Sequence, residues 1–291
     1  MKRKFPDIES YISENRFSPY LDYCNGDRSK SLVLYQMNLR LSGVFMPLIS
    51  MLEVSLRNRI DGLLEDKYSS KDNRNWLQIL SEQIKLDTQS GRIEKSELRE
   101  LSSQLNSAIK GVETKIDRNI TNYLHRYYRM HDKSYKKKSK EAKKQILQRD
   151  LQGIKSKEGY KIKKGVMIAK SNFALWTSFF DPLAYKYTDG VVLKIFDFSF
   201  AEDDEKNRKK VAERLYNIRQ FRNRIAHHES IIFKSQKFEP SYPEQIRDDI
   251  LSVLRLLNED LSIYTEDISR INKDIRDIDD YCSEIKRIVG T

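Results

Sequence analysis

Residues 31–68 decide the fold class, and they read SLVLYQMNLRLSGVFMPLISMLEVSLRNRIDGLLEDKY. Apolar side chains recur in this stretch at intervals of three and four residues, at Leu34, Leu41, Val44, Phe45, Leu48, Met51, Leu52 and Leu56. That spacing aligns them along one face of an α-helix. Pro47 lies inside the pattern and is expected to kink or divide the helix, because proline removes one backbone hydrogen bond.

The same periodicity returns further along the chain. It predicts a long helix from about Lys95 to Tyr128, a second that includes Val211 to Ile225, and helical structure over 246–288. The whole chain holds only ten Gly and six Pro, too few for the many tight turns of a β-sandwich or barrel. We therefore predict an all-α fold.

One short block is apolar and aromatic and is expected to lie in the core. It runs from Val166 to Phe180, and Asp181-Pro182 after it predicts a turn or the start of a helix. The two cysteines, Cys24 and Cys282, lack the paired spacing of a zinc site or a disulfide framework, so we expect free thiols and predict no metal and no cofactor.

Neither a secretory signal nor a membrane span is predicted. The basic start, Met1 to Asp7, leads into polar residues instead of an apolar segment. The most apolar window, Val44 to Leu56, is interrupted by Pro47 and Glu53 and is shorter than the roughly 20 residues that cross a bilayer. We expect a cytoplasmic protein that does not contact a membrane.

Positive charge is concentrated in one part of the chain. The net charge is +11, and residues 126–170 hold sixteen Lys and Arg against four Asp and Glu. Within them, the stretch from Lys133 to Lys164 is expected to be a mobile arm or insertion in which Ile146 and Leu147 anchor a short helix. Its glycines predict loops at Gly153, Gly159 and Gly165.

This basic segment has two interpretations. It is either a solvated, disordered arm, or a surface that binds RNA. Tyrosines interleave with the basic residues from Tyr123 to Tyr135, a mixture that can stack bases and pair with phosphates. The candidate RNA-binding residues are Arg126, Arg129, Lys136, Lys137, Lys138, Lys143 and Lys144.

Residues 218–229, IRQFRNRIAHHE, carry the most informative chemistry. On a helix with about 100° per residue, Arg219, Asn223 and His227 share one face and Arg222 lies alongside. Arginine can neutralise a phosphate, asparagine can hold an imidazole, and histidine can move protons near neutral pH. A structural role is the alternative, because basic residues near a helix C-terminus often bind its last carbonyl groups.

The stretch Arg222-Asn223-Arg224-Ile225-Ala226-His227 resembles the Arg-x(4–6)-His signature of the HEPN superfamily, within it the Abi-like abortive-infection branch. Two further blocks are similar to that branch: Phe173 to Phe180, and Leu52 to Ile60 together with Trp76. These matches bracket residues 35–235. The resemblance implies a HEPN-type helical bundle with long additional helices and the basic excursion 133–164, all within one domain over 1–291.

The resemblance also implies a metal-independent endoribonuclease, a toxin-like effector of phage defence, with its site shared across a homodimer. Arg222, Asn223 and His227 would be catalytic, His228 could replace His227 in the x(5) register, and Arg219 and Arg224 would hold flanking phosphates. The products would carry 2′,3′-cyclic phosphates. An antitoxin or a non-coding RNA is a further candidate partner.

Two other functions remain open. The chain could hold a structured regulatory RNA without cutting it, or it could be a structural interaction protein whose motif merely caps a helix. A second pair, Arg57-Asn58, has Gly62 where a histidine would be needed, so it lacks a proton-transfer group. It is expected to be structural, with Glu53 as the ion-pair partner of Arg57, or to position RNA.

Overall fold

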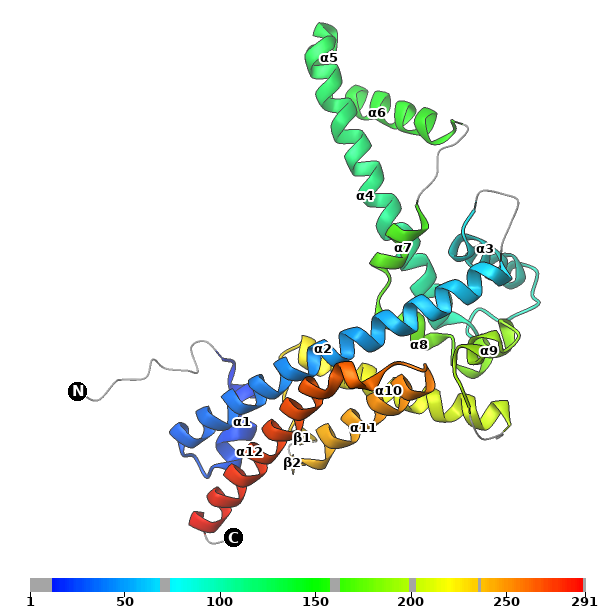
Figure 1. Ribbon diagram of the computed structural model, residues 1–291. Helices are drawn as coiled ribbons and strands as arrows, with labels where there is room; N and C mark the ends of the chain where they lie inside the picture. The colour runs from blue at the N-terminus through cyan, green and yellow to red at the C-terminus, as the bar shows by residue number, and fades with distance from the viewer. Residues whose placement is uncertain (1–11, 69–73, 158–162, 199–202, 235–236, 290–291) are drawn as a thin grey trace. The chain divides into compact units, whose positions relative to one another are not determined.

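A computed structural model describes residues 12–68, 74–157, 163–198, 203–234 and 237–289 (Figure 1). Helices make up most of these residues, and the only strands among them are two residues long each, which confirms the predicted all-α fold. Met1 to Asp7 and Gly159, to which two sequence predictions refer, lie outside the described residues.

The chain forms two compact units. One comprises residues 1–58 and 193–291, and the other comprises residues 59–192. Helix α2 (Arg28–Lys67) runs through the boundary, and η2 (Val191–Ile195) contains the second crossing. Because α2 continues from one unit into the other, the two units are not separated by a linker at that point. The prediction of a single domain over 1–291 stays a prediction.

The first unit combines the two ends of the chain. Besides the first part of α2, its elements are α1 (Glu14–Tyr23), α10 (Asp204–Ala226), β1 (Phe233–Lys234), β2 (Lys237–Phe238), α11 (Ser241–Leu256), η3 (Leu261–Tyr264) and α12 (Thr265–Val289). The strands pair antiparallel as a short hairpin, with Phe233 opposite Phe238. The expected helical stretch over 246–288 is therefore interrupted between α11 and α12.

The second unit is built around one long helix, α4 (Arg99–His131). Five helices pack against it: α3 (Trp76–Gln89), α5 (Lys133–Lys137), α6 (Lys140–Lys155), α7 (Lys164–Lys170) and α8 (Phe173–Ser178). The unit also contains α9 (Pro182–Tyr187).

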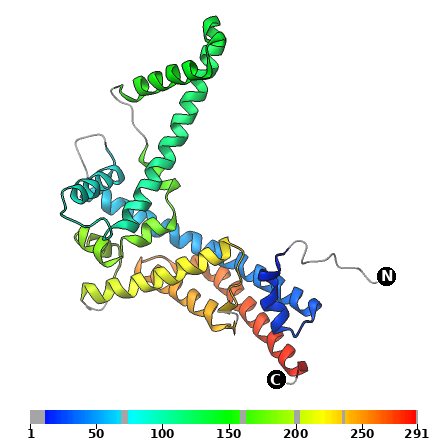
Figure 2. The same cartoon turned by 180° about the vertical axis from the view of Figure 1, so that it is seen from behind.

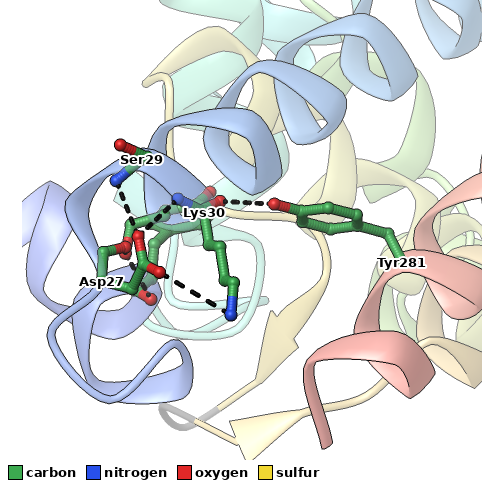
Figure 3. Close-up of polar contacts among 6 residues, drawn as sticks. Asp27, Ser29, Lys30 and Tyr281 are labelled. Atoms are coloured by element: carbon green, nitrogen blue, oxygen red, sulfur yellow. Dashed lines mark hydrogen bonds and ion pairs between the residues drawn. The ribbon is translucent and has the colours of Figure 1, made fainter. Parts of the chain in front are cut away.

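Helix α2 is continuous over 40 residues, so Pro47 does not divide it, and the alternative expectation of a kink stays a prediction. The proline costs one hydrogen bond to the carbonyl of Gly43, and the burial of Phe45, Leu48 and Leu52 around it offsets that loss. The helix also begins earlier than its apolar pattern, because the Asp27 carboxylate accepts hydrogen bonds from the backbone N–H groups of Ser29 and Lys30 (Figure 3).

Helix α12 is tied to this start of α2. The Tyr281 hydroxyl donates a hydrogen bond to the Lys30 carbonyl at 3.3 Å (Figure 3). Farther along, Arg40 pairs with Asp274 and Asp277, at 2.9 Å in each case. The two helices, from opposite ends of the sequence, thus pack within one unit.

Among the described helices, α2 alone is long and apolar enough to cross a membrane. In its 18-residue apolar window, 39% is buried inside the protein. Most of its apolar row, including Leu34, Phe45 and Leu52, is fully buried, whereas Met51 is 41% exposed. The prediction of a cytoplasmic protein without membrane contact stays a prediction.

Most of the aromatic block lies in the core of the second unit, as predicted, although Val166 at its start is 43% exposed. Phe173, Trp176, Phe179 and Phe180 are all buried, and Trp76 contacts both Trp176 and Phe179 through edge-to-face packing. Pro182 is the first residue of α9, which confirms the predicted helix start.

The lysine-rich stretch is more helical than expected. Gly153 lies inside α6 and Gly165 inside α7, so the loops predicted there are wrong. A single glycine costs a helix only about 1 kcal/mol, and the start of α6 offsets a similar amount, because the Ser139 hydroxyl accepts a hydrogen bond from the Ala142 N–H. Figures 1 and 2 show α6 turning away from the end of α4 that also carries α5.

Both cysteines are free, as predicted, and both are buried. Burial raises the pKa of the Cys282 thiol to about 12, with Tyr23 and Cys24 as neighbours. The fold therefore brings the two thiols, which are far apart in the sequence, into one apolar environment.

Candidate active site at the end of helix α10

Helix α10 carries the motif, and its sequence defines both of its ends. The Asp203 carboxylate caps the start by accepting a hydrogen bond from the Lys206 N–H at 2.8 Å, and Asp204 and Glu205 complement the helix dipole in the first turn. The predicted apolar face is confirmed, because its members are all buried: Val211, Leu215, Ile218, Phe221 and Ile225.

The helix ends in a Schellman turn formed by the two histidines of the motif. The His228 N–H donates to the Ile225 carbonyl at 3.0 Å, and the Glu229 N–H donates to the Arg224 carbonyl at 2.8 Å. His228 has a φ of +56°, a conformation that histidine adopts more readily than most residues with a side chain. The turn holds both imidazoles on the surface.

The predicted alignment of three polar side chains along one face of α10 extends as far as His227, the residue after the last helical one. The His227 N–H still donates to the Asn223 carbonyl at 2.9 Å, so Arg219, Asn223 and His227 follow one another at helical spacing. Arg219 and Asn223 are half-buried and His227 is exposed. The Arg219 guanidinium lies over the Tyr216 ring, 5.9 Å from its centroid.

Four polar side chains of the motif have no hydrogen bond or ion pair to any described residue. They are Arg222, Asn223, His227 and His228. Arg222 is half-buried, so its charge is partly removed from water without a carboxylate to neutralise it. Such a group is a candidate for binding an external anion.

Arg224, in contrast, has a structural role in this fold. Its guanidinium donates to the Phe233 carbonyl at 2.6 Å and lies over the Tyr242 ring, 5.7 Å from the centroid. Its Nε is 3.8 Å from the Glu229 carboxylate. Arg224 therefore joins the end of α10 to the β-hairpin and to α11, which limits its freedom to hold a flanking phosphate.

The segment after the histidines is anchored from α2. The buried Asn38 side chain accepts a hydrogen bond from the Ile231 N–H at 2.9 Å, and the Ser230 hydroxyl donates to it at 3.4 Å. The same hydroxyl accepts from the Phe233 N–H at 3.2 Å. These bonds fix the chain direction after the turn, and with it the positions of His227 and His228.

A cavity of about 220 Å³ opens beside this turn. It is smaller than the ~300 Å³ or more typical of sites for whole drug-sized ligands, so it suits a fragment such as a ribose or a phosphate. Two arginines, one histidine and a serine hydroxyl offer donors to it. The lining residues are Asn15, Arg16, Pro19, Arg224, His228, Glu229, Ser230 and Phe233.

The cavity divides the predicted site residues into two groups. His228 and Arg224 line it, whereas Arg222, Asn223 and His227 are not among its lining residues. Helix α1 supplies the opposite wall through Asn15 and Arg16, which the sequence analysis missed. No motif marks these two residues, because only the packing of α1 brings them to the end of α10.

The predicted RNA-binding residues of the basic segment lie in the other unit. Arg126, Arg129, Lys136, Lys137 and Lys144 are exposed on α4 to α6, and Lys138 and Lys143 are half-buried. The Lys143 ammonium lies over the Tyr135 ring, 5.8 Å from its centroid, and donates to the Lys136 carbonyl.

Arg57 has the partner that the sequence predicts. Its guanidinium donates to the Glu53 carboxylate at 3.0 Å, and both side chains are largely buried, so a structural role is supported. Across the described residues, no group of three or more His, Cys, Asp or Glu side chains is placed to hold a metal ion.

Comparisons with protein-family models, with curated proteins and with solved structures find no match for this chain. The resemblance to the Abi-like branch of the HEPN superfamily thus stays a prediction that rests on the sequence motifs. What the structure adds is the geometry of the segment that carries them.

Proposed function

We propose that this chain is an endoribonuclease that cuts RNA without a metal ion, through Arg222 and His227, as an effector of phage defence. The observation that carries the proposal is the end of α10, where a half-buried arginine and two exposed imidazoles have no partner among the described residues. The defence role rests only on the motif resemblance.

The chemistry we propose is transesterification. The ribose 2′-oxygen attacks phosphorus, its proton passes to an imidazole, and the bond from phosphorus to the 5′-oxygen breaks. The leaving oxygen then takes a proton from the imidazolium, which gives a 2′,3′-cyclic phosphate and a 5′-hydroxyl and restores the neutral imidazole. Arg222 stabilises the added negative charge on the phosphoryl oxygens, and Asn223 orients His227.

A homodimer would place Arg222 of one chain opposite His227 of the other. Arg222 and His227 are five residues apart, roughly 140° around a helix, so one narrow pocket in a single chain does not receive both squarely. Two copies of the motif facing each other resolve this, because each chain then contributes one group to each site. In this arrangement His228 and Arg16 bind a neighbouring phosphate in the cavity beside the turn.

The test is cleavage of mixed tRNA, mRNA and structured RNA in the presence of EDTA. Positioned acid–base groups contribute about 100-fold or more, so Arg222→Ala and His227→Ala should each lower the rate by at least that factor. Gln220→Ala, an exposed change on the same helix, is the matched control and should retain the wild-type rate. Unchanged cleavage by both site variants would contradict the proposal.

The shared site has its own test. Arg222→Ala and His227→Ala subunits are inactive alone, but a mixed dimer contains one intact site. After random exchange of subunits, about a quarter of the wild-type activity should return. Activity that stays at the level of the separate variants would contradict a composite site.

A second candidate function is RNA binding without cleavage. The exposed basic residues on α4 to α6 favour it, since they provide a phosphate-binding surface independent of the α10 motif. RNA that is bound tightly and recovered intact from the wild-type protein in the same assay would support this candidate.

A further inference from the structure

The outer face of helix α4 carries a row of exposed rings, which we call the aromatic row: Tyr123, Tyr127 and His131. Tyr123 is 66% exposed and Tyr127 is 48% exposed. The two tyrosine rings are stacked with centroids 6.4 Å apart, and the His131 ring follows at 4.7 Å from Tyr127. Met130, which is 73% exposed, extends the same apolar surface.

Other rings of this region have a structural role that the aromatic row lacks. The Tyr128 hydroxyl donates a hydrogen bond to Asp150 and so joins α4 to α6. Tyr135 is buried, stacks on Tyr128 and bonds to the His125 ring at 2.7 Å. Packing within the fold therefore accounts for Tyr128 and Tyr135, whereas the rings of the aromatic row are exposed to water. Contiguous exposed apolar surface of this kind marks a binding site.

In the same region, acidic side chains are bonded within the fold, whereas many basic side chains are not. Three of its carboxylates are occupied within the fold: Asp117 pairs with Lys155, Asp132 caps α5, and Asp150 bonds to Tyr128 and Arg149. Five exposed basic side chains, by contrast, form no ion pair with any described residue: Arg126, Arg129, Lys136, Lys137 and Lys144. The surface is thus strongly positive where the rings are exposed.

Rings and charges are also adjacent on the helix. Arg126 precedes Tyr127 by one residue and lies about 60° around α4 from Tyr123, so its guanidinium borders the aromatic row along one side. A bound chain that stacks bases on the rings would bring its phosphates within reach of Arg126 and of the lysines of α5 and α6.

We infer that the outer surface of α4, with α5 and the start of α6, binds single-stranded RNA by stacking unpaired bases on the aromatic row. This inference rests on the proposed function for RNA as the polymer, and it adds single-strandedness and a site on the other unit. Unpaired bases expose the ring faces that tyrosine and histidine stack on, whereas bases of a duplex are already stacked on each other. The unpaired basic residues favour a polyanion over an apolar partner.

The experiment measures fluorescence anisotropy of a labelled 2′-O-methyl oligouridylate, and of a 2′-O-methyl RNA duplex of equal length, with the full-length protein. The methyl group blocks the 2′-oxygen that the proposed cleavage needs, so the bound strand stays intact. Stacking of one base is worth about 5- to 150-fold in affinity. Tyr123→Leu/Tyr127→Leu should therefore weaken oligouridylate binding at least 10-fold, whereas the matched control Tyr123→Phe/Tyr127→Phe, which keeps both rings, should bind as the wild type does.

The salt dependence tests the charged part of the surface. Each phosphate contact contributes about 0.7 to the slope of log affinity against log salt for a single strand. Arg126→Gln/Arg129→Gln should reduce that slope by about 1.4, and Arg126→Lys/Arg129→Lys should preserve it. All substituted residues are exposed, so the variants should unfold at the wild-type temperature.

Two results would overturn the inference: equal oligouridylate affinity of the leucine and phenylalanine variants, or duplex binding as tight as single-strand binding with the same sensitivity. These outcomes are separate from the fate of the proposed function. Ring-dependent binding by a protein that leaves the mixed RNA of the cleavage assay intact refutes the nuclease and retains this site. Cleavage with ring-independent binding refutes this site and retains the nuclease.

Discussion

Replacing Asn38, which lies on α2, should disturb the candidate site at the end of α10 through the segment that follows the histidines. Its buried side chain accepts the Ile231 N–H at 2.9 Å, directly after the turn that carries both histidines. In Asn38→Ala and in Asn38→Leu this N–H remains buried without an acceptor, which costs about 1 to 3 kcal/mol. With roughly 2 to 4 °C per kcal/mol for a domain of this size, the melting temperature should fall by about 2 to 12 °C.

Urea unfolding and hydrogen exchange of the Ile231 amide measure this effect. The matched control is Asn106→Ala on α4, where the lost group is a half-buried side-chain amide that donates to the Ser102 carbonyl at 2.8 Å and accepts from the Ser81 hydroxyl, which can turn to water, at 3.3 Å. This control should cost about 1 kcal/mol or less, because the carbonyl keeps its helical bond. The reasoning is refuted if both Asn38 variants are no less stable than the control, or if the Ile231 amide exchanges at the wild-type rate.

Three further predictions concern other parts of the fold. Arg224→Met should destabilise the protein by about 1 to 3 kcal/mol, since it leaves the Phe233 carbonyl without its charged donor; an unchanged urea midpoint would contradict this. Cys282, with its pKa raised to about 12, should resist a thiol reagent at about pH 8 in the native protein and react fully once unfolded. The hydrogen bond from Tyr128 lowers the pKa of Asp150, so its stabilisation of α6 should be complete above the unperturbed value of 3.8 and disappear as the pH falls through the lower folded value. Hydrogen exchange of α6 measures this, and protection that does not change over that range would contradict it.

Apolar periodicity was sufficient to predict α2, α4, α10 and the helical structure over 246–288, but α1 and α3 were not predicted. It places Leu34 and Leu56 on one face of α2, and Phe221 and Ile225 on the core face of α10, because burial of one side of a helix imposes that spacing. Pro47 does not divide α2, because the buried side chains on both sides of it hold the helix in the core, and local helix propensity does not include that packing. The β-hairpin at Phe233 escaped it as well, because two-residue strands leave no alternating pattern.

The sequence predicted the residues of the candidate site that lie on α10 but not those that other elements contribute. The motif indicates which residues share the end of α10, but the Schellman turn decides that His228 lines the cavity and that Arg224 is engaged with the hairpin. Asn15, Arg16 and Asn38 come from distant parts of the chain. Their roles depend on tertiary packing, for which a single sequence carries no local signal.

The chemistry of the product ends tests the proposed nuclease most directly. RNA incubated with the wild-type protein in EDTA should yield fragments with 5′-hydroxyl ends, which accept phosphate from a kinase without prior phosphatase treatment, and with 2′,3′-cyclic phosphates at the other end. The same fragments should be missing with His227→Ala. Fragments with 5′-phosphates, or RNA that stays intact while bound, would contradict the transesterification that we propose for the end of α10.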